Sequence, residues 1–386
     1  MKRLKPRINV KDTMQLHSQA KVEFYRNYLQ RYLRILYRVD YICQINIFDV
    51  FCGMGIYKDG RKGSPIIAYD IIRDVFFECG KQRKVQLIIN DADIARVTNV
   101  QEYIEKSNSK YPCCKVIYRN QDAETMLYKI QNFVARTKSD VRNLIFIDPY
   151  GYKQIKKEMI EGLMTNNKTE IILFLPISHM YRFTQYAIEN EDRTQYKPLC
   201  DFVKSFFSDE HPIVKNEEIT VMEYISYLRQ ALNFDGRFYA TSYHIERNKN
   251  SYFALFFLSP NLLGYEKNLE VKWALDTEDG NGFNLPEPPS LFDVIDKAKA
   301  KDKMYERLRN YLLHYLKLPR TNNDIYKYTL ENEFLPSQAK QVLMKLQEEK
   351  RISVIKYKDK TTARKSAFYL SYHYYKEEPK VLINLK

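Results

Sequence analysis

Four aspartates that follow short apolar segments are the side chains of this sequence best placed to do chemistry. They are Asp49, Asp91, Asp122 and Asp148. If the apolar segments are parallel strands, the four carboxylates meet at one edge of a sheet, where α/β folds bind their ligands. A carboxylate there can accept hydrogen bonds from both hydroxyls of a ribose or from an exocyclic amine. One such aspartate alone would more simply be a helix cap, but four in succession predict a shared site.

The segment 47–55, Ile-Phe-Asp-Val-Phe-Cys-Gly-Met-Gly, joins Asp49 to two closely spaced glycines, Gly53 and Gly55. A glycine turn lets a nucleotide-like ligand come close to the backbone, and such turns serve both NAD and S-adenosylmethionine. The dinucleotide fingerprint has a third glycine three residues after the second, where this chain has Lys58. The turn therefore favours S-adenosylmethionine, and an NAD(P)-dependent enzyme is the weaker alternative.

The element Asp148-Pro149-Tyr150 is the most specific of these motifs. Methyl transfer from a sulfonium is an in-line displacement that mainly requires an aligned acceptor. Asp148 and the Pro149 carbonyl can accept the hydrogens of an exocyclic amine while Tyr150 stacks on the base, which would be extruded from a duplex. Methylation at C5 of a pyrimidine needs a nucleophilic cysteine after the proline, and Tyr150 stands there instead. A Pro-Tyr-Gly turn capped by Asp148 is the structural alternative.

Three neighbouring side chains are weaker candidates. His179 follows the fifth expected strand, at the rim where an acceptor would lie, and a loop histidine without a role explains it as well. His17 and Lys21 lie four residues apart and would share a helix face. We expect both to be surface residues.

These candidates need a doubly wound sheet to bring them together, and the hydrophobic pattern predicts one. A helix is expected over 21–36. The expected strands are 45–50, 85–89, 115–118, 144–147 and 171–175, and the expected helices between them are 66–77, 92–107, 123–135 and 153–164. Ser64 and Pro65 predict the start of the first of these helices, with Ser64 as its N-cap. Alternating strands and helices imply a parallel sheet with helices on both faces.

A polar helical insertion at about 180–232 precedes two more expected strands, 237–245 and 252–258. The turn-prone Arg-Asn-Lys-Asn joins them. A hairpin that closes a parallel sheet is unusual in nicotinamide-binding folds and usual in class I methyltransferases. The predicted fold class is therefore α/β, with a Rossmann-like class I methyltransferase sheet in a domain over 41–275.

Residues 276–292 predict a linker, because the segment is acidic, rich in glycine and proline, and poor in apolar residues. Beyond it, 293–386 has the layout of a winged helix-turn-helix domain. Its expected helices are 305–316, 321–330 (with Thr321 as N-cap) and 337–350, and its expected wing strands are 352–357 and 367–372. The third helix and the wing carry the predicted nucleic-acid contacts, Lys340, Lys345, Lys358, Lys360, Arg364 and Lys365. Many domains of this layout instead bind protein or dimerise.

The formal net charge of +14 is concentrated at the two ends of the chain. The expected basic helical segment 1–40 has 10 basic and 3 acidic side chains, and 291–386 has 21 and 12. The middle, 41–290, has 31 basic and 33 acidic side chains. This distribution suits basic ends that contact DNA or RNA around a near-neutral ligand-binding middle, although solvated lysine-rich faces would also produce it.

Other classes of protein are disfavoured by what the sequence lacks. The longest apolar runs are too short for a membrane span, and the N-terminus has no apolar signal-peptide region. Six cysteines show no zinc-type spacing and are expected to be free thiols. We therefore expect a cytoplasmic protein with no membrane contact and no metal.

The motifs together resemble those of the three-Cys-motif partner proteins (TcmP), a bacterial and archaeal family with a class I methyltransferase-like domain. The matching pieces are His17-Ser18 with Lys21, Phe48-Asp49 with Phe51, Gly53 and Gly55, Gly63-Ser64-Pro65, Ile147-Asp148-Pro149-Tyr150-Gly151, and Leu258-Ser259-Pro260. They span roughly 1–275, and the C-terminal winged helix is also similar to that family's. The Asp-Pro-aromatic-Gly element resembles that of tRNA guanine-N2 dimethyltransferases as well. Cys52 departs from the alanine of many relatives, a small change that should not abolish the pocket.

The resemblance implies an S-adenosylmethionine pocket formed by Asp49, Phe51, Gly53, Gly55, Asp91 and Asp122, with Asp148, Pro149 and Tyr150 at the acceptor. It also implies a three-Cys-motif, radical-SAM-like protein partner, in a phage-defence or mobile-element setting. The leading hypothesis is a methyltransferase acting on an exocyclic amine of a nucleic-acid base. The alternative is a non-catalytic adaptor that binds S-adenosylmethionine and nucleic acid for that partner.

Overall fold

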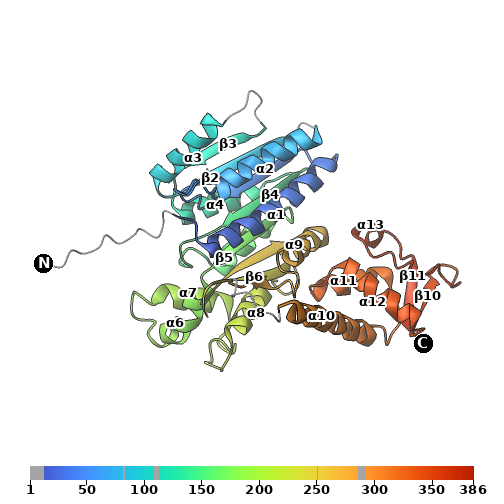
Figure 1. Ribbon diagram of the computed structural model, residues 1–386. Helices are drawn as coiled ribbons and strands as arrows, with labels where there is room; N and C mark the ends of the chain where they lie inside the picture. The colour runs from blue at the N-terminus through green and yellow to red at the C-terminus, as the bar shows by residue number, and fades with distance from the viewer. Residues whose placement is uncertain (1–12, 81–82, 108–112, 250, 286–292) are drawn as a thin grey trace. The chain divides into compact units, whose positions relative to one another are not determined.

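Asn261 and Leu262 mark the main boundary between two units of the chain (Figure 1). The computed structural model describes residues 13–80, 83–107, 113–249, 251–285 and 293–386, with the backbone alone for 293–298. The first unit is Met1–Asn261 with Phe283–Leu285, and the second is Leu262–Gly282 with Pro286–Lys386. The beginning of the expected basic segment 1–40 and the end of the expected linker 276–292 lie outside the described residues.

The first unit is built on one mixed sheet with the strand order β3-β2-β1-β4-β5-β7-β6-β8. The strands are β1 (Gln44–Asp49), β2 (Lys84–Asn90), β3 (Lys115–Arg119), β4 (Val141–Ile147), β5 (Thr169–Leu175), β6 (Tyr239–Asn248), β7 (Ser251–Ser259) and β8 (Gly282–Phe283). Strands β1 to β5 are parallel, and β7 lies antiparallel between β5 and β6. The five expected parallel strands and the closing hairpin are thus confirmed.

The central parallel strands end level with one another. Asp49, the last residue of β1, is in register with Ile89 of β2 and Phe146 of β4. Asp91 and Asp148 directly follow β2 and β4. Three of the four predicted carboxylates therefore leave the sheet at the same edge.

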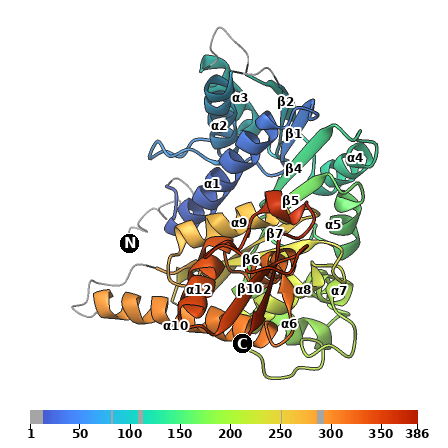
Figure 2. The same cartoon turned by 90° about the vertical axis from the view of Figure 1, so that its right-hand side faces the viewer.

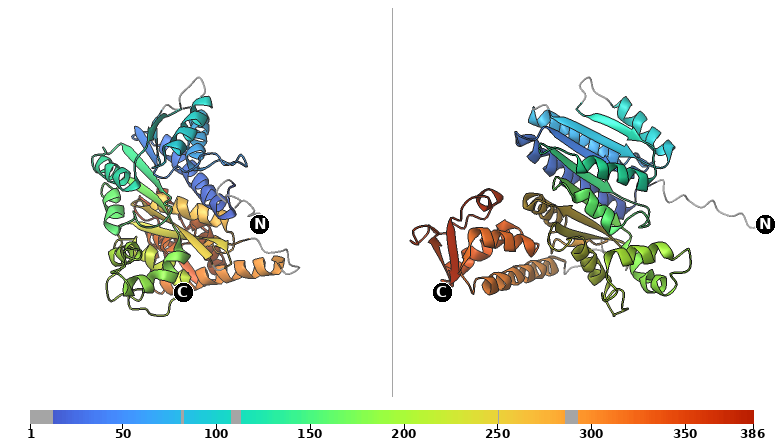
Figure 3. Two further views of the ribbon diagram at one scale, coloured as in Figure 1. Left: turned by 90° about the vertical axis from the view of Figure 1, so that its left-hand side faces the viewer. Right: turned by 180° about the vertical axis from the view of Figure 1, so that it is seen from behind.

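Helices cover both faces of this sheet (Figure 2, Figure 3). On one face, α1 (Leu16–Arg38) packs along α2 (Ser64–Cys79), which contacts α3 (Ile94–Lys106). The other face shares one apolar core with α4 (Ala123–Ala135), α5 (Lys157–Met164), α6 (Ile177–Glu189), α7 (Lys197–Phe206) and α8 (Val221–Ala231). Successive side chains of β4 point to opposite faces of the sheet. Phe146 stacks on Tyr25 of α1 with ring centroids 4.4 Å apart, and Ile145 lies in the core on the other face.

A buried hydrogen-bond network fixes α1 to the sheet. The Tyr28 hydroxyl donates to Oε2 of Glu170 (2.5 Å), and the Ser259 hydroxyl donates to Oε1 of the same carboxyl (2.7 Å). Burial raises the pKa of Glu170 to about 7, and the two hydrogen bonds act in the opposite sense. Helix α1 begins five residues before the expected 21–36, so that its first turns carry His17 and Lys21.

The predicted start of α2 is wrong by one residue. Gly63 is the N-cap, and Ser64 lies inside the first turn together with Pro65. The Gly63 amide already donates to the Gly55 carbonyl (2.6 Å), which closes the preceding loop one residue earlier than the sequence suggested. The Ser64 hydroxyl instead lies beside Asp49.

The second unit contains five helices and three strands among the residues described. They are α9 (Leu262–Leu275), α10 (Asp293–Tyr315), α11 (Asn322–Glu331), α12 (Pro336–Glu348), α13 (Tyr372–Tyr375), β9 (Arg320–Thr321), β10 (Ile352–Lys356) and β11 (Val381–Leu385). The strand order is β10-β11-β9. The Thr321 cap is confirmed, because its hydroxyl accepts from the Asp324 amide (3.1 Å) and Asp324 accepts from the Thr321 amide (3.0 Å). Three helices and a small antiparallel sheet make this a winged helix.

The predicted second wing strand, 367–372, is wrong. Phe368 and Leu370 are buried there, but Ser366 and Tyr369 have φ of 61° and 52°, which an extended strand does not allow. The partner of β10 is β11, which pairs Val354 with Ile383 and buries alternate residues.

Helix α9 was missed by the sequence pattern, and it belongs to the second unit rather than to the sheet domain expected to end at residue 275. Its Lys272 is 1% exposed and pairs with Glu333 (2.5 Å), whose carbonyl accepts from the Trp273 indole (2.8 Å). No helix within the described ranges has the length and apolar character needed to cross a membrane.

Candidate active site

The glycine turn after β1 forms the floor of the candidate site. Gly53 and Gly55 have φ of 59° and 70°, in the left-handed region that favours glycine. A Cβ on Gly55 would lie 2.4 Å from Cγ2 of Val100, so α3 packs directly on the turn. A Cβ on Gly53 would meet nothing within 4 Å, so the space above this glycine is open.

Asp91 holds that turn in place. Its Oδ2 accepts from the Gly53 amide (3.1 Å) and its Oδ1 from the Asp93 amide (3.0 Å). Arg96 pairs with it at 3.5 Å, and only 4% of Asp91 is exposed. Each carboxylate oxygen can accept a second hydrogen bond, so the contact to a ribose stays a prediction.

Asp49 is buried without a hydrogen-bond partner. It is 0% exposed, and neither oxygen has a partner at hydrogen-bond geometry among the described residues, although the Ser64 hydroxyl and the Phe51 amide lie close by. The pKa of Asp49 is raised to about 7, mainly by burial and also by the nearby Asp148, while Ser64, the Phe51 amide and Lys21 favour the charged form. The Tyr25 hydroxyl, whose pKa is raised by burial and then by Asp49, is also buried with no partner among the described residues. A buried acceptor of this kind fits a ligand that brings a cation or a hydrogen-bond donor.

Asp122 has a different role from Asp49 and Asp91, because it caps a helix. It caps α4, since Oδ1 accepts from the Thr125 amide (2.9 Å) and Oδ2 from the Thr125 hydroxyl (2.7 Å). The Thr125 amide is the main cause that lowers the pKa of this exposed carboxyl. Its predicted contact to an adenine is not tested by this geometry.

Gln121, the residue before this cap, was missed by the sequence reasoning. Asn90 at the end of β2 donates to the Gln121 carbonyl (3.0 Å) and accepts from its amide (3.1 Å). The side-chain oxygen Oε1 of Gln121 is buried with no partner in the described part of the chain. The available signal was the Asn-Gln-Asp sequence just after an apolar run.

Lys21 forms an ion pair with Asp148, and the expectation that it is a surface residue is wrong. The Lys21 side chain is 12% exposed and that of Asp148 is 19% exposed. Lys21 Nζ also lies 4.7 Å from the ring centre of Phe174. The partner is 127 residues away in the chain, so helix spacing alone could not reveal it.

His17 is likewise not a simple surface residue. Its ring stacks on Phe253, with centroids 5.0 Å apart and planes 16° from parallel. Burial, and then the charges of Lys21 and Arg247, lower the pKa of His17 to about 4. His17 is therefore neutral at pH 7.

Tyr150 projects from the site, with Pro149 buried before it. Tyr150 is 73% exposed, and the Arg96 guanidinium lies 4.9 Å above its ring and donates to its hydroxyl. Arg96 thereby links Tyr150 to Asp91, and it covers one face of the ring predicted to stack on a base.

A cavity of about 560 Å³ opens beside Tyr150. Aromatic rings form about half of its lining, and they are those of Phe51, Tyr150, Tyr152, His179, Tyr252 and Phe253. Lys153 and Arg247 add positive charge. A cavity of this size and character suits a ligand of nucleoside size. The hairpin residues in its wall were not predicted, because their place depends on how β7 inserts in the sheet.

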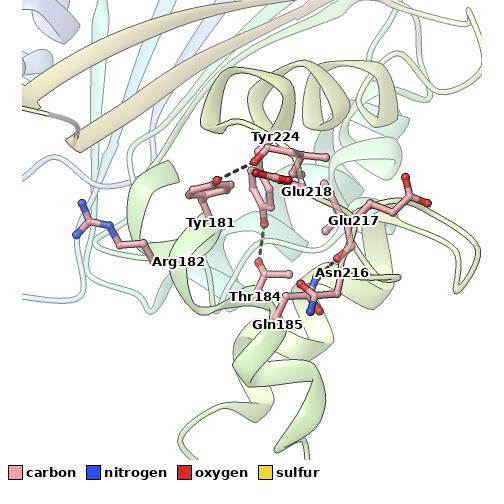
Figure 4. Close-up of a pocket in the computed structure, with 10 residues that line it drawn as sticks. Tyr181, Arg182, Thr184, Gln185, Asn216, Glu217, Glu218 and Tyr224 are labelled. Carbon is pink, nitrogen blue, oxygen red and sulfur yellow. Dashed lines mark hydrogen bonds between the residues drawn. The ribbon is translucent and has the colours of Figure 1, made fainter.

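A second cavity, of about 430 Å³, lies in the helical insertion (Figure 4). Its walls come from α6, α8 and the segment before α8. The Tyr181 hydroxyl donates to the Ile219 carbonyl (2.7 Å), and the hydroxyls of Thr184 and Tyr224 lie 3.1 Å apart. These internal pairs indicate a structural role.

The six predicted nucleic-acid contacts are spread over α12 and the loop after β10. Lys340 and Lys345 are exposed on α12, and Lys345 lies 5.2 Å from the ring centre of Tyr305. In the loop, Lys358 pairs with Glu378 (2.9 Å), Lys365 pairs with Glu348 (3.6 Å), and Lys360 lies 4.6 Å from the ring centre of Tyr357. Arg364 is exposed. The role of all six in binding nucleic acid stays a prediction.

Comparison with known families finds one match, and it lies in the second part of the chain. Residues 276–358 match a family described as the GMT-like wHTH domain. No curated protein sequence matches the chain.

The chain is also similar to several solved structures, all at low sequence identity. Trm1 from Pyrococcus horikoshii in complex with S-adenosyl-L-methionine is 11% identical, with 90% of this chain and 92% of that chain covered and a TM-score of 0.32. An O-methyltransferase from Bacillus cereus in complex with SAH is 14% identical, with 61% and 80% covered and a TM-score of 0.30. A dimethyladenosine transferase from Plasmodium falciparum is 9% identical, with 82% and 95% covered and a TM-score of 0.27.

The fold class is therefore a class I methyltransferase-type α/β sheet with a C-terminal winged helix. The evidence for the sheet is the strand order, with the antiparallel β7 between β5 and β6. The evidence for the winged helix is the family match and the observed elements. A fold alone does not determine activity, so function has to be argued from the site.

Proposed function

We propose that the protein is an S-adenosylmethionine-dependent methyltransferase that acts on an exocyclic amine of a nucleic-acid base. The observation that carries this proposal is the meeting, at one sheet edge, of an unpartnered buried Asp49, a glycine turn and the Asp148-Pro149-Tyr150 element. An aromatic cavity lies beside them. Together they supply a place for a cationic methyl donor and a place for a planar acceptor.

The residues at the glycine turn fit the proposed cofactor. Asp49 offers a buried carboxylate to the positive charge of the donor, and Gly53 leaves open space for its close approach. Asp91, Gln121 and Asp122 would take the ribose and adenine end, and Phe51 lines the acceptor side. When bound, S-adenosylmethionine supplies a methyl group on a sulfonium.

The acceptor residues would align the amine and remove its proton. Oδ1 of Asp148 and the Pro149 carbonyl accept hydrogens of the amine, which directs the nitrogen lone pair at the methyl carbon. As the carbon–nitrogen bond forms and the carbon–sulfur bond breaks, the nitrogen gains positive charge. It then loses one hydrogen as a proton to Asp148, and from there to water. The aromatic walls would stack on the extruded base and exclude water.

Nucleic acid is the proposed substrate class because of the charge distribution. The excess of basic residues lies at the two ends of the sequence, and the C-terminal part folds as a winged helix. Cations there would hold phosphates while the base enters the aromatic cavity. DNA and RNA are both compatible with this argument.

A non-catalytic adaptor is the second candidate, because Lys21 occupies Oδ2 of Asp148 and leaves only Oδ1 to accept the amine. In that case the protein would bind S-adenosylmethionine and nucleic acid for a three-Cys-motif, radical-SAM-like partner. The proposal of a three-Cys-motif partner includes the proposal that the protein is a member of the TcmP family.

The decisive experiment measures transfer of labelled methyl groups from S-adenosylmethionine to total cellular RNA or DNA. We expect incorporation by the wild type, and a loss of at least about 100-fold in Asp148→Ala with the cofactor Kd unchanged. Asp74→Ala, which removes an exposed carboxylate on α2, is the control for general effects of losing an aspartate. Cofactor binding without incorporation, with and without a partner, would favour the adaptor. Tighter binding of NAD than of S-adenosylmethionine, measured by calorimetry, would exclude both the methyltransferase and the adaptor.

A further inference from the structure

The ion pair between Lys21 and Asp148 joins the first turns of α1 to the end of β4. Removing an ammonium group from water is costly unless a carboxylate compensates it. Lys21 is nearly enclosed, with 12% of its side chain exposed, and it bonds to Oδ2 of Asp148. Phe174 lies against its ammonium group. Such an arrangement needs an explanation in terms of either folding or function.

Anchoring of α1 is a poor explanation for this pair. The helix is already held by the Tyr28–Glu170 hydrogen bond and by the stacking of Tyr25 on Phe146. Phe24 also contacts Tyr243 of β6, with ring centroids 5.1 Å apart. The helix thus has apolar and polar anchors along its length that do not involve Lys21.

The surroundings of Lys21 point to the reaction site instead. The groups whose charges interact with it are His17 on its own helix, Asp49 and Tyr57 around the glycine turn, and Asp148. Asp49 and Asp148 are two carboxylates within interaction range of each other, and Lys21 offsets the repulsion between them. His17 is neutral and adds no second charge to this group.

We propose that Lys21 is a positioning residue for methyl transfer, which holds Oδ2 of Asp148 so that Oδ1 faces the acceptor amine. This inference rests on the proposed function. The ammonium group fixes the rotation of the carboxylate through its bond to Oδ2, which leaves Oδ1 for the acceptor. The first turns of α1 therefore belong to the acceptor site, although they precede the sheet in sequence.

The test compares Lys21→Met, Lys21→Arg and Arg26→Met. Arg26 lies on the same helix, and its pair with Glu23 (3.6 Å) is on the surface. We expect Lys21→Met to lower kcat by about 10- to 100-fold while KM for nucleic acid and the cofactor Kd change less than about threefold. Lys21→Arg should restore part of kcat, and Arg26→Met should leave it unchanged. Melting curves show whether each variant is folded.

A double-mutant cycle separates positioning from a general structural role. If Lys21 acts through Asp148, Lys21→Met should cause little further loss of kcat in an Asp148→Asn background. An active wild type with an equally active Lys21→Met would overturn the inference and leave the proposed function intact. Full additivity in the cycle would overturn it too. A wild type that transfers no methyl group to any nucleic acid would overturn both.

Discussion

Charged side chains are buried at the strand ends of the first unit, whereas in the wing of the second unit they are exposed and paired with each other. At the strand ends, Asp49 is fully buried and lacks a hydrogen-bond partner among the described residues. In the wing, the Lys358 and Glu378 side chains are 76% and 58% exposed and pair with each other at 2.9 Å. One region keeps a carboxylate buried with neither oxygen in a hydrogen bond among the described residues, and the other pairs its cations with its own acids at the surface.

This difference predicts where single substitutions matter. A buried carboxylate without a partner is unfavourable in the free protein, so a ligand that supplies a donor gains a large advantage there. Exposed ion pairs contribute only about 0–1 kcal/mol and weaken with salt. We therefore expect large individual effects at the strand ends, and small effects that add up in the wing.

The largest effect should come from Asp49→Asn. We expect it to weaken S-adenosylmethionine binding by about 100-fold, since a neutral amide cannot pair with the cationic donor. In the wild type, cofactor affinity should rise as pH increases through about 7, because the pKa of Asp49 is raised to about 7 and the charged form binds the cation. Calorimetry between pH 6 and pH 8 measures the affinity of the variant and the pH dependence of the wild type. Strong binding by Asp49→Asn, or a flat pH profile, would remove Asp49 from the cofactor site.

The same substitution should stabilise the free protein. The folded pKa of Asp49 lies above its ordinary value, so the folded state holds an extra proton between about pH 4 and pH 7 and loses stability as pH rises through that window. The amide of the Asp49→Asn variant does not titrate, and the gain at pH 8 should be about 1–3 kcal/mol in the free energy of unfolding. Urea titrations at pH 5 and pH 8 would show it, with no gain at pH 8 as the contrary result.

An intermediate effect should distinguish the two glycines of the turn. Gly55→Ala combines a positive φ with a 2.4 Å approach to Val100 and should cost about 2–3 kcal/mol of stability. Gly53→Ala has the positive φ without the collision and should cost about 1 kcal/mol. Adding Val100→Ala should recover part of the loss in Gly55→Ala and none in Gly53→Ala. Equal costs for both glycines would show that α3 yields to the added methyl group.

The smallest effects should be found in the wing. Replacing Lys358, Lys360 and Lys365 by Gln should change stability by less than about 1 kcal/mol in total. Nucleic-acid affinity should fall, and the salt dependence should become shallower by about one unit of slope per lost phosphate contact. The control replaces three exposed lysines on and after α10, Lys301, Lys303 and Lys317. Equal losses of nucleic-acid affinity in the two triple variants would show that only the net charge matters. An affinity that does not change with salt would favour a protein partner for the winged helix.

The parallel sheet could be predicted from the sequence because its strands are continuous apolar runs that end in polar residues. The roles of the strand-end aspartates could not be separated in this way. Asp49 and Asp122 both follow such runs, yet one is buried without a partner and the other caps a helix. Only the depth of each residue in the fold distinguishes them.

Long-range partners explain the remaining differences. Lys21 looked like a surface residue because its carboxylate partner is distant in sequence. The second wing strand was wrong because burial of Phe368 and Leu370 imitates a strand, while the positive φ of Tyr369 is not encoded by a glycine. Helix α9 has no clear polar face, because its polar residues Glu266, Asn268 and Lys272 are buried. Its sequence therefore lacks the apolar–polar periodicity that predicts a helix.

The Glu170 network has a consequence for the order in which the protein folds during synthesis. Helix α1 is made before the sheet, yet Tyr28 requires Glu170, and Glu170 requires Ser259 at the end of β7. Strand β7 must also insert between β5 and β6 before the sheet is complete. Contacts this distant in sequence form slowly. The face of helix α1 that carries Tyr28 therefore cannot complete its contacts until most of the first unit has been synthesised, and a chaperone that shields this face in that interval would raise the yield of folded protein.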